Sequence, residues 1–161
     1  MDTMTIEEYK ALQGKSGKKK ATPEHDEQVA LFYWAELNSN KIPSLKLLMA
    51  IPNGASYGGG GGRWNIAKRM KDEGVKKGVP DVFLPVPMMY IEEDEKTQQK
   101  VTSIKAGLWI EMKAGKNKPS DEQNWWIEQL EEMGYRVEVC YSSQEAIDVI
   151  NDYLDLNSKD K

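Results

Sequence analysis

Residues 107–123, GLWIEMKAGKNKPSDEQ, begin as a buried β-strand and then place two charged side chains where the strand should stay apolar. Side chains two positions apart lie on the same face of a strand. Glu111 and Lys113 therefore point one way, and Ile110 and Met112 point the other way. A Glu-x-Lys pair taken alone is often a surface ion pair that contributes less than about 1 kcal/mol. The neighbouring segments must decide between such a pair and a functional site.

Hydrophobic spacing, helix caps and turn residues around this segment predict an alternation of helices and strands. Strands 81–91 and 104–113 are expected to form an antiparallel hairpin, joined by the acidic residues 92–100. Two late prolines indicate that the first of these strands is an edge strand or leaves the sheet early. The predicted fold class is α/β, with a mixed central β-sheet flanked by helices. The other expected elements are helices at 24–38, 63–74, 120–134 and 142–154, and strands at 44–54 and 135–141.

Asp81 begins the first hairpin strand, and the expected pairing brings it beside Glu111. Two converging carboxylates repel each other and raise one pKa unless a cation lies between them. Mg²⁺ or Mn²⁺ suits this site because both take oxygen ligands, and the backbone carbonyl of Met112 is a further candidate ligand. Lys113 is placed to stabilise charge on a phosphate or to orient or help deprotonate an attacking water. The pattern predicts phosphodiester hydrolysis with a divalent cation.

Pro80-Asp81 followed by Glu111-Met112-Lys113 resembles the motif of the PD-(D/E)xK nuclease superfamily. The resemblance sharpens to the virus-type replication-repair nuclease family, VRR-NUC, through AIPNG, GVPDVFLPVP, IEMKAG, PSDEQNWW and GYRVEVCYSSQEAIDVI. It covers about residues 22–154. It implies a restriction-endonuclease-like fold, similar to Holliday-junction resolvases. It also implies a metal-dependent DNA endonuclease that prefers branched DNA, acts as a homodimer and serves phage replication, recombination or repair.

Carried over onto this chain, the resemblance implies that Asp81 and Glu111 bind the metal ion and that Lys113 is the catalytic lysine. The family's motif glutamine falls on Gln123. Ser120-x-x-Gln123 is also a capping box, so a role that only closes the helix N-terminus remains open.

The family's first-helix glutamate matches Glu24, with Glu27 one turn along as the competitor. The two side chains lie on neighbouring parts of one helical face. Glu24 is also open to a simpler role, as a first-turn acid that complements the helix dipole. His25, in the same turn, is expected at the surface rather than at a metal ion.

A basic segment follows the five glycines at 58–62. Residues 63–77 hold six basic and two acidic side chains, which fits either a phosphate-binding face or a solvated helix face. Asn53 precedes the glycines, where a simple turn and a contact with nucleic acid are both open. The candidate nucleic-acid contacts are Asn53, Arg63, Lys68, Arg69 and Lys116.

Composition limits the remaining possibilities. The 161 residues suffice for one domain, which we expect at 22–156, between a flexible basic tail at 1–21 and a polar tail at 157–161. One cysteine and one histidine argue against a disulfide, a Cys- or His-rich zinc site and a serine-protease triad. The net charge of −4 argues against a general nucleic-acid coat protein.

The first residues lack a secretory pattern and no apolar run reaches the ~20 residues of a membrane span. We therefore expect a cytoplasmic protein, in the host cell if it is phage-encoded, with no membrane partner and no small-molecule cofactor. The alternative to a nuclease is a noncatalytic DNA-binding or recruitment module on the same fold. The presence of every catalytic residue type disfavours this alternative.

Overall fold

The computed structural model describes residues 23–52, 63–93 and 99–154. Asn53, the five glycines and both tails lie outside the described residues. The helices are α2 (Pro23–Asn38), the 3-10 helix η1 (Pro43–Leu47), α3 (Arg63–Asp72), α4 (Asp121–Glu132) and α5 (Ser143–Tyr153). The strands are β1 (Met49–Ala50), β2 (Val82–Leu84), β3 (Met88–Glu93), β4 (Lys100–Lys105), β5 (Leu108–Met112) and β6 (Arg136–Cys140).

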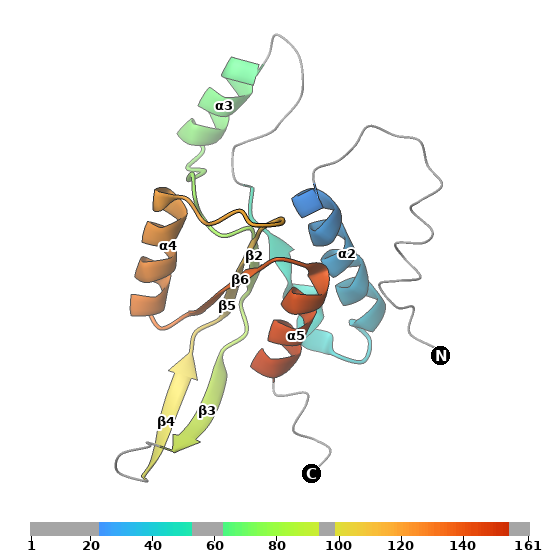
Figure 1. Cartoon of the computed structure of the whole chain (residues 1–161), viewed down its shortest axis with the longest axis vertical. Helices are drawn as coiled ribbons and strands as arrows, with labels where there is room; N and C mark the ends of the chain where they lie inside the picture. The colour runs from blue at the N-terminus through green and yellow to red at the C-terminus, as the bar shows by residue number, and fades with distance from the viewer. Residues whose placement is uncertain (1–22, 53–62, 94–98, 155–161) are drawn as a thin grey trace.

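A four-stranded sheet in the order β1-β2-β5-β6 lies at the centre of the described structure. Its first two pairings are antiparallel and the pairing of β5 with β6 is parallel. Helices α2 and α5 cover one face and α4 covers the other, which gives three layers (Figure 1). The predicted mixed sheet flanked by helices is confirmed.

The main hydrophobic core lies between the sheet and the α2–α5 pair. Alternate residues of β2 and β5 point into it, and burying each large aliphatic side chain stabilises the fold by about 1.5–3 kcal/mol. The buried cluster contains Leu31, Ala35, Leu45, Leu48, Val82, Leu84, Leu108, Ile110, Met112, Cys140, Ala146, Ile147, Ile150 and Tyr153.

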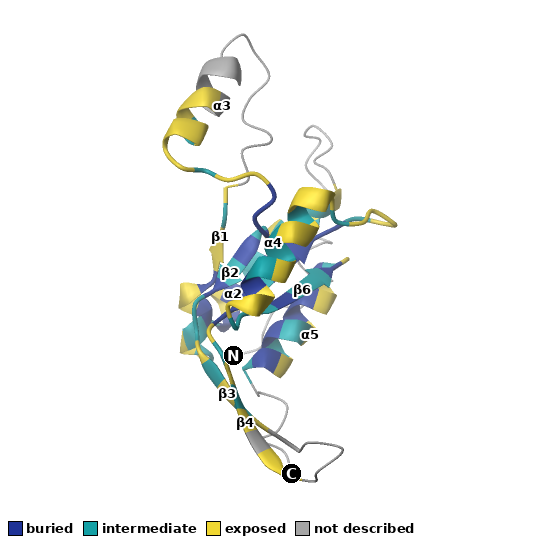
Figure 2. Cartoon of the chain, turned by 90° about the vertical axis from the view of Figure 1, so that its left-hand side faces the viewer, coloured by how far each residue is buried: buried dark blue, intermediate teal, exposed yellow. Residues whose placement is uncertain are grey.

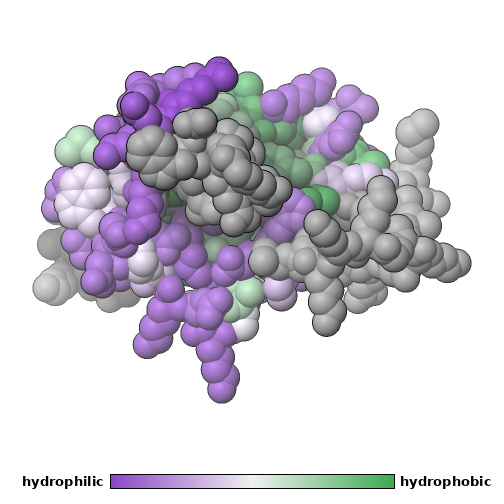
Figure 3. Space-filling view, turned by 90° about the horizontal axis from the view of Figure 1, so that it is seen from above, coloured by the Kyte–Doolittle hydropathy of each residue, from purple (hydrophilic) through white to green (hydrophobic). Residues whose placement is uncertain are grey.

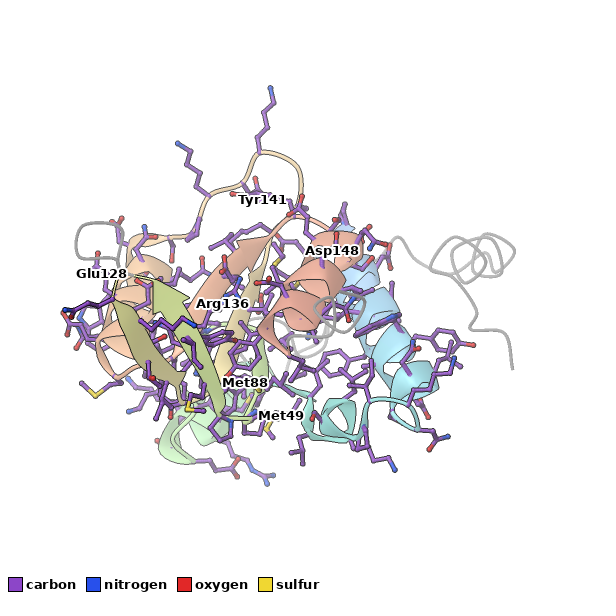
Figure 4. The ribbon with its side chains drawn as sticks, turned by 90° about the horizontal axis from the view of Figure 1, so that it is seen from below. Met49, Met88, Glu128, Arg136, Tyr141 and Asp148 are labelled. Atoms are coloured by element: carbon purple, nitrogen blue, oxygen red, sulfur yellow. The ribbon has the colours of Figure 1, made fainter. Side chains whose placement is uncertain are left out.

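Edge strand β6 is fastened to α5 by Arg136. Its Nε lies 2.8 Å from Oε1 of Glu138 on the same strand, and one of its terminal nitrogens lies 2.7 Å from Oδ2 of Asp152 on α5. Figure 4 shows Arg136 on the sheet side of α5. These contacts help to hold the parallel strand against the helix that follows it.

The predicted hairpin is correct in direction but is divided into two pairings. Strand β2 pairs with β5, Val82 opposite Ile110, and β3 pairs with β4, Met88 opposite Lys105. The stretch Pro85-Val86-Pro87 separates them because proline cannot donate to a strand ladder. The expected acidic loop is also too long, since β3 and β4 continue into it.

The strand expected at 44–54 is largely wrong. Residues Pro43–Leu47 form a 3-10 helix, and in the described part of this segment, up to residue 52, only Met49 and Ala50 are strand residues paired with β2. Both of these strand residues are exposed rather than buried. Proline at the first helical position favours the turn, because its fixed φ suits a helix start. The buried residues Leu45 and Leu48 gave this segment its apolar appearance.

Two parts project from the compact centre. Helix α3 and the β3–β4 hairpin stand at opposite ends, whereas the buried residues gather where the sheet meets α2, α4 and α5 (Figure 2). Among the described helices, none is long and apolar enough to cross a membrane. The site described next lies at the end of the sheet from which α3 projects.

Candidate active site

The Pro80-Asp81 pair ends the β2–β5 ladder. The register, continued by two residues, places Pro80 opposite Met112. Proline has no N–H to donate to the carbonyl of Met112. The amide of Met112 instead donates a hydrogen bond of 2.9 Å to Oδ2 of Asp81. The dipeptide thus stops the ladder, brings a carboxylate to the end of β5, and offers no ladder donor to the Met112 carbonyl.

Glu111 is completely buried at this end of β5. Its Oε1 accepts hydrogen bonds from Nζ of Lys113, at 2.5 Å, and from Nε2 of Gln123. Its Oε2 is buried and has no hydrogen-bond partner within residues 23–52, 63–93 and 99–154. Buried polar atoms are nearly always paired, so an unpaired carboxylate oxygen calls for an explanation.

The electrostatics of the site centre on Glu111. Burial, followed by the negative charge of Asp81, raises the pKa of Glu111 to about 7. The hydrogen bond and the charge of Lys113 oppose this rise, and the charge of Glu24 adds to it. The converging carboxylates expected from the sequence are therefore brought together in the structure.

The two glutamates of α2 have different partners. Oε1 of Glu24 accepts a hydrogen bond of 3.2 Å from the amide of Ala114, directly after the Glu-x-Lys motif. Oε2 of Glu27 accepts bonds of 2.7 and 2.6 Å from the amide and hydroxyl of Ser143, at the start of α5. The structure brings Glu24 to the site and uses Glu27 to join α2 to α5.

Gln123 serves the helix cap and the site together. Its backbone N–H donates to Oγ of Ser120 at 3.3 Å, and its side-chain Oε1 accepts from the backbone N–H of Ser120 at 2.9 Å. These two bonds complete the capping box. Its Nε2 remains to donate to Glu111. The two roles left open by the sequence occur in one side chain.

Lys113 is 8% exposed, and with Glu111 it forms a buried ion pair rather than the surface pair considered as an alternative. Burying the two charges costs hydration free energy, which their 2.5 Å contact offsets only in part. This contact holds the lysine at the carboxylates.

The candidate DNA contacts are more scattered. Lys68 and Arg69 are exposed on α3, where Nε of Arg69 lies 2.7 Å from Oε1 of Glu73. Lys116 is exposed on the loop after β5. Arg63 is the first residue of α3, but its side chain lies outside the described part, as does all of Asn53.

One contact of the site was missed by the sequence reasoning. Nε1 of Trp126 on α4 donates a hydrogen bond of 3.0 Å to the carbonyl of Lys77, just before the GVPD motif. Gly78 in turn lies against the backbone of Glu122. The glycine immediately before Val-Pro-Asp was a signal of close backbone approach that could have pointed to this contact.

The donor set at this end of the sheet fits a hard divalent cation. Within 23–52, 63–93 and 99–154, no three acidic, histidine or cysteine side chains are arranged around one metal position. Even so, the charges of Asp81 and Glu24 both act on Glu111, and one buried oxygen of Glu111 has no hydrogen-bond partner among the described residues. Carboxylate oxygens suit Mg²⁺ and Mn²⁺. Glu24, Asp81 and Glu111 are the residues that would hold such an ion.

A mixed sheet that ends in Pro-Asp and Glu-x-Lys, with a glutamine from the next helix, defines a nuclease-type α/β fold. The family model of the VRR-NUC domain matches residues 62–144, just over half of the chain. The chain belongs to the VRR-NUC family.

A solved structure named "VRR_NUC domain protein" has the same fold. It is 23% identical to this chain, with a TM-score of 0.58 over 86% of this chain and 93% of the other. The comparison with curated proteins gives no match.

Proposed function

We propose that this protein is a Mg²⁺- or Mn²⁺-dependent endodeoxyribonuclease that hydrolyses phosphodiester bonds. The observation that supports it most directly is the buried Glu111 carboxylate. Burial and the charge of Asp81 raise its pKa, and its Oε2 has no hydrogen-bond partner in the described part of the chain. A fold gains nothing from such an arrangement, since apolar residues of similar size would pack without that cost. The VRR-NUC domain independently indicates a nuclease-type fold.

The proposed division of labour follows from the contacts. Glu24, Asp81 and Glu111, with the backbone carbonyl of Met112, hold the cation. When bound, the cation polarises a phosphate oxygen and lowers the pKa of a water molecule. Lys113 stabilises the negative charge that develops on the phosphate and orients the attacking water. We expect products with 5′-phosphate and 3′-hydroxyl ends.

Gln123 is proposed to position Glu111 rather than to touch the substrate. Its Nε2 donates to Oε1 of Glu111, while the rest of its amide is fixed by the cap of α4. A ligand held by a capped helix keeps one geometry, which metal sites require of their supporting residues.

The proposed substrate is branched DNA, and the proposed active form is a homodimer in phage replication, recombination or repair. Exposed Lys68 and Arg69 on α3 and Lys116 near the site support a DNA-binding role for this end of the molecule. Viewed from that end, hydrophilic side chains make up much of the described surface (Figure 3). Arg63 and Asn53 are proposed to extend the same contact.

The test is cleavage of labelled four-way junction, flap and linear duplex DNA with Mg²⁺, Mn²⁺ or EDTA, beside the variant Asp81→Ala. Paired symmetric nicks in the junction that disappear with EDTA and in the variant support a dimeric, resolvase-like nuclease. Junction binding without cleavage under either metal would instead favour the noncatalytic recruitment module.

A further inference from the structure

The first turn of α4 touches both halves of the site. Gln123 donates to Glu111 on β5, as described above. One residue earlier, the backbone of Glu122 lies against Gly78, three residues before Asp81. A single helical turn therefore contacts the strand that carries one carboxylate and the chain that leads to the other.

The contact at Gly78 leaves no room for a side chain. A Cβ placed on Gly78 would lie 3.0 Å from both the carbonyl carbon and the Cβ of Glu122, and 3.2 Å from its carbonyl oxygen. Backbone atoms inside a helix cannot move aside as the end of a flexible side chain can. A substitution here must push the 78–81 chain and α4 apart.

Two polar contacts accompany this packing. Nε1 of Trp126 donates to the carbonyl of Lys77 at 3.0 Å. Nζ of Lys77 also lies 2.6 Å from Oε1 of Glu122, but both of these side chains are largely exposed, so this ion pair contributes little. The tryptophan bond and the glycine packing are the parts of the contact that fix the backbone.

We propose that the first turn of α4 is a clamp that aligns Asp81 with Glu111, and that Gly78 is a positioning residue for Asp81 within it. This inference rests on the proposed function, because it assigns Gly78 a part in building the same site. Val79 and Pro80, which join Gly78 to Asp81, are buried, so a shift at Gly78 is transmitted to Asp81 rather than absorbed by a loose loop.

The test compares Gly78→Ala with Gly134→Ala. Gly78 has φ +84° and Gly134 has φ +85°, so alanine suffers the same backbone strain at both positions. A Cβ on Gly134 would meet nothing within 4 Å, unlike one on Gly78. The difference between the two variants therefore reports the contact with α4 and not the loss of a glycine.

The first readout needs neither metal nor DNA. The hydrogen bond from the amide of Met112 to Oδ2 of Asp81 reports the position of the carboxylate, through the amide proton shift and its protection from hydrogen exchange. Both are expected to fall in metal-free Gly78→Ala and to stay as in the wild type in Gly134→Ala. Equal amide behaviour in the two variants would overturn the clamp, whether or not the protein cuts DNA.

The second readout is single-turnover cleavage. We expect about a tenfold lower rate in Gly78→Ala, because the contact requires a shift of a few tenths of an ångström and a displacement of about 1 Å costs about 10²-fold. The loss in Gly134→Ala should be less than about threefold. DNA affinity is expected to be the same in both variants. Equal cleavage rates would also overturn the proposal.

A second pair of variants decides the matter if Gly78→Ala does not fold. Trp126→Phe removes the hydrogen bond to Lys77 but keeps an aromatic side chain. Its control is Trp125→Phe, because Trp125 is 54% exposed and packs edge-on against Trp126, so this variant alters the same ring pair and leaves the Trp126 donor in place. The amide proton resonance of Met112 is expected to shift in Trp126→Phe and not in Trp125→Phe. Cleavage by Trp126→Phe is expected to be about tenfold slower. Indistinguishable spectra of these two variants would contradict the clamp.

Discussion

The two faces of the central sheet are made from the same strands but differ in chemistry. Ile110 and Glu111 are consecutive on β5, and both are completely buried. Ile110 lies in the apolar cluster beneath α2 and α5. Glu111 lies on the α4 side, where burial and Asp81 raise its pKa to about 7.

Two equally buried side chains can therefore contribute to the free energy of folding with opposite signs. An aliphatic side chain gains free energy when it leaves water, whereas a carboxylate loses its hydration and must find partners. The core face stabilises the sheet enough to tolerate a costly group on the opposite face. Substitutions at Ile110 should therefore mainly change the free energy of unfolding, and substitutions at Glu111 should mainly change the rate of DNA cleavage.

The largest expected effect is on cleavage. Glu111→Gln keeps the shape and the hydrogen-bond acceptor of the side chain but removes its charge. We expect the single-turnover rate of DNA cleavage to fall about 10³-fold. A metal ion that is bound weakly or out of position would stabilise the transition state by several kcal/mol less. The control is Ile110→Val, which should cut within about threefold of the wild type. Similar losses in both variants would break the distinction between the faces.

The next effect is on stability. Ile110→Ala removes buried methyl groups from the core face and should lower the free energy of unfolding by about 2–5 kcal/mol. Denaturant unfolding measures this, and the slope of free energy against denaturant should stay constant. Glu111→Gln should not be destabilised in the same way. A large, equal destabilisation in both would mean that Glu111 has a mainly structural role.

A smaller effect concerns pH in the metal-free protein. Glu111 has a pKa of about 7 when folded and an ordinary value of 4.5 when exposed, so the folded state binds more protons between these values. The contribution of Glu111 to stability therefore falls as pH rises from about 4.5 to 7. Relative to the wild type, Glu111→Gln should melt at a similar temperature at pH 4 and at a higher one at pH 8. Calorimetry in EDTA would contradict this if the difference were the same at both pH values.

The smallest effect concerns the basic helix that projects beyond the site. Lys68→Gln on α3 should weaken DNA binding and reduce the slope of log affinity against log salt by about 0.9, as expected for one lost phosphate contact. Lys46→Gln on η1, also exposed, is the control and should leave the slope unchanged. Binding titrations over a range of salt concentrations measure both. Equal slopes for Lys68→Gln and Lys46→Gln would show that the DNA does not contact Lys68.

Local signals predicted much of the fold. Helices α4 and α5 each follow a serine whose side chain accepts a hydrogen bond from the backbone amide three residues later. Both helices also have clear apolar periodicity. The strand at 44–54 failed because the apolar run there fills a short turn rather than a ladder. The hairpin was broken because Pro85 and Pro87 cannot donate to it, a consequence that the sequence indicated only in part.

The sequence predicted those parts of the candidate site whose positions follow from strand geometry alone. Period-two alternation and an antiparallel register suffice to bring Asp81 to Glu111 and to place Lys113 on the same face. The choice between Glu24 and Glu27 could not be made, because Ser143, which engages Glu27, lies far away in the sequence. Gly78 signals a close backbone approach, but its partner on α4 is a tertiary contact that no local pattern identifies.

The central claim is that a divalent cation compensates the buried charge of Glu111, and calorimetric titration of Mn²⁺ into the DNA-free protein tests it most directly. We expect the wild type to bind Mn²⁺ and Glu111→Gln to lose this binding. Binding should be retained in Glu27→Gln, since the carboxylate of Glu27 accepts from Ser143 and joins α2 to α5. Absence of binding in the wild type, or undiminished binding in Glu111→Gln, would contradict the account.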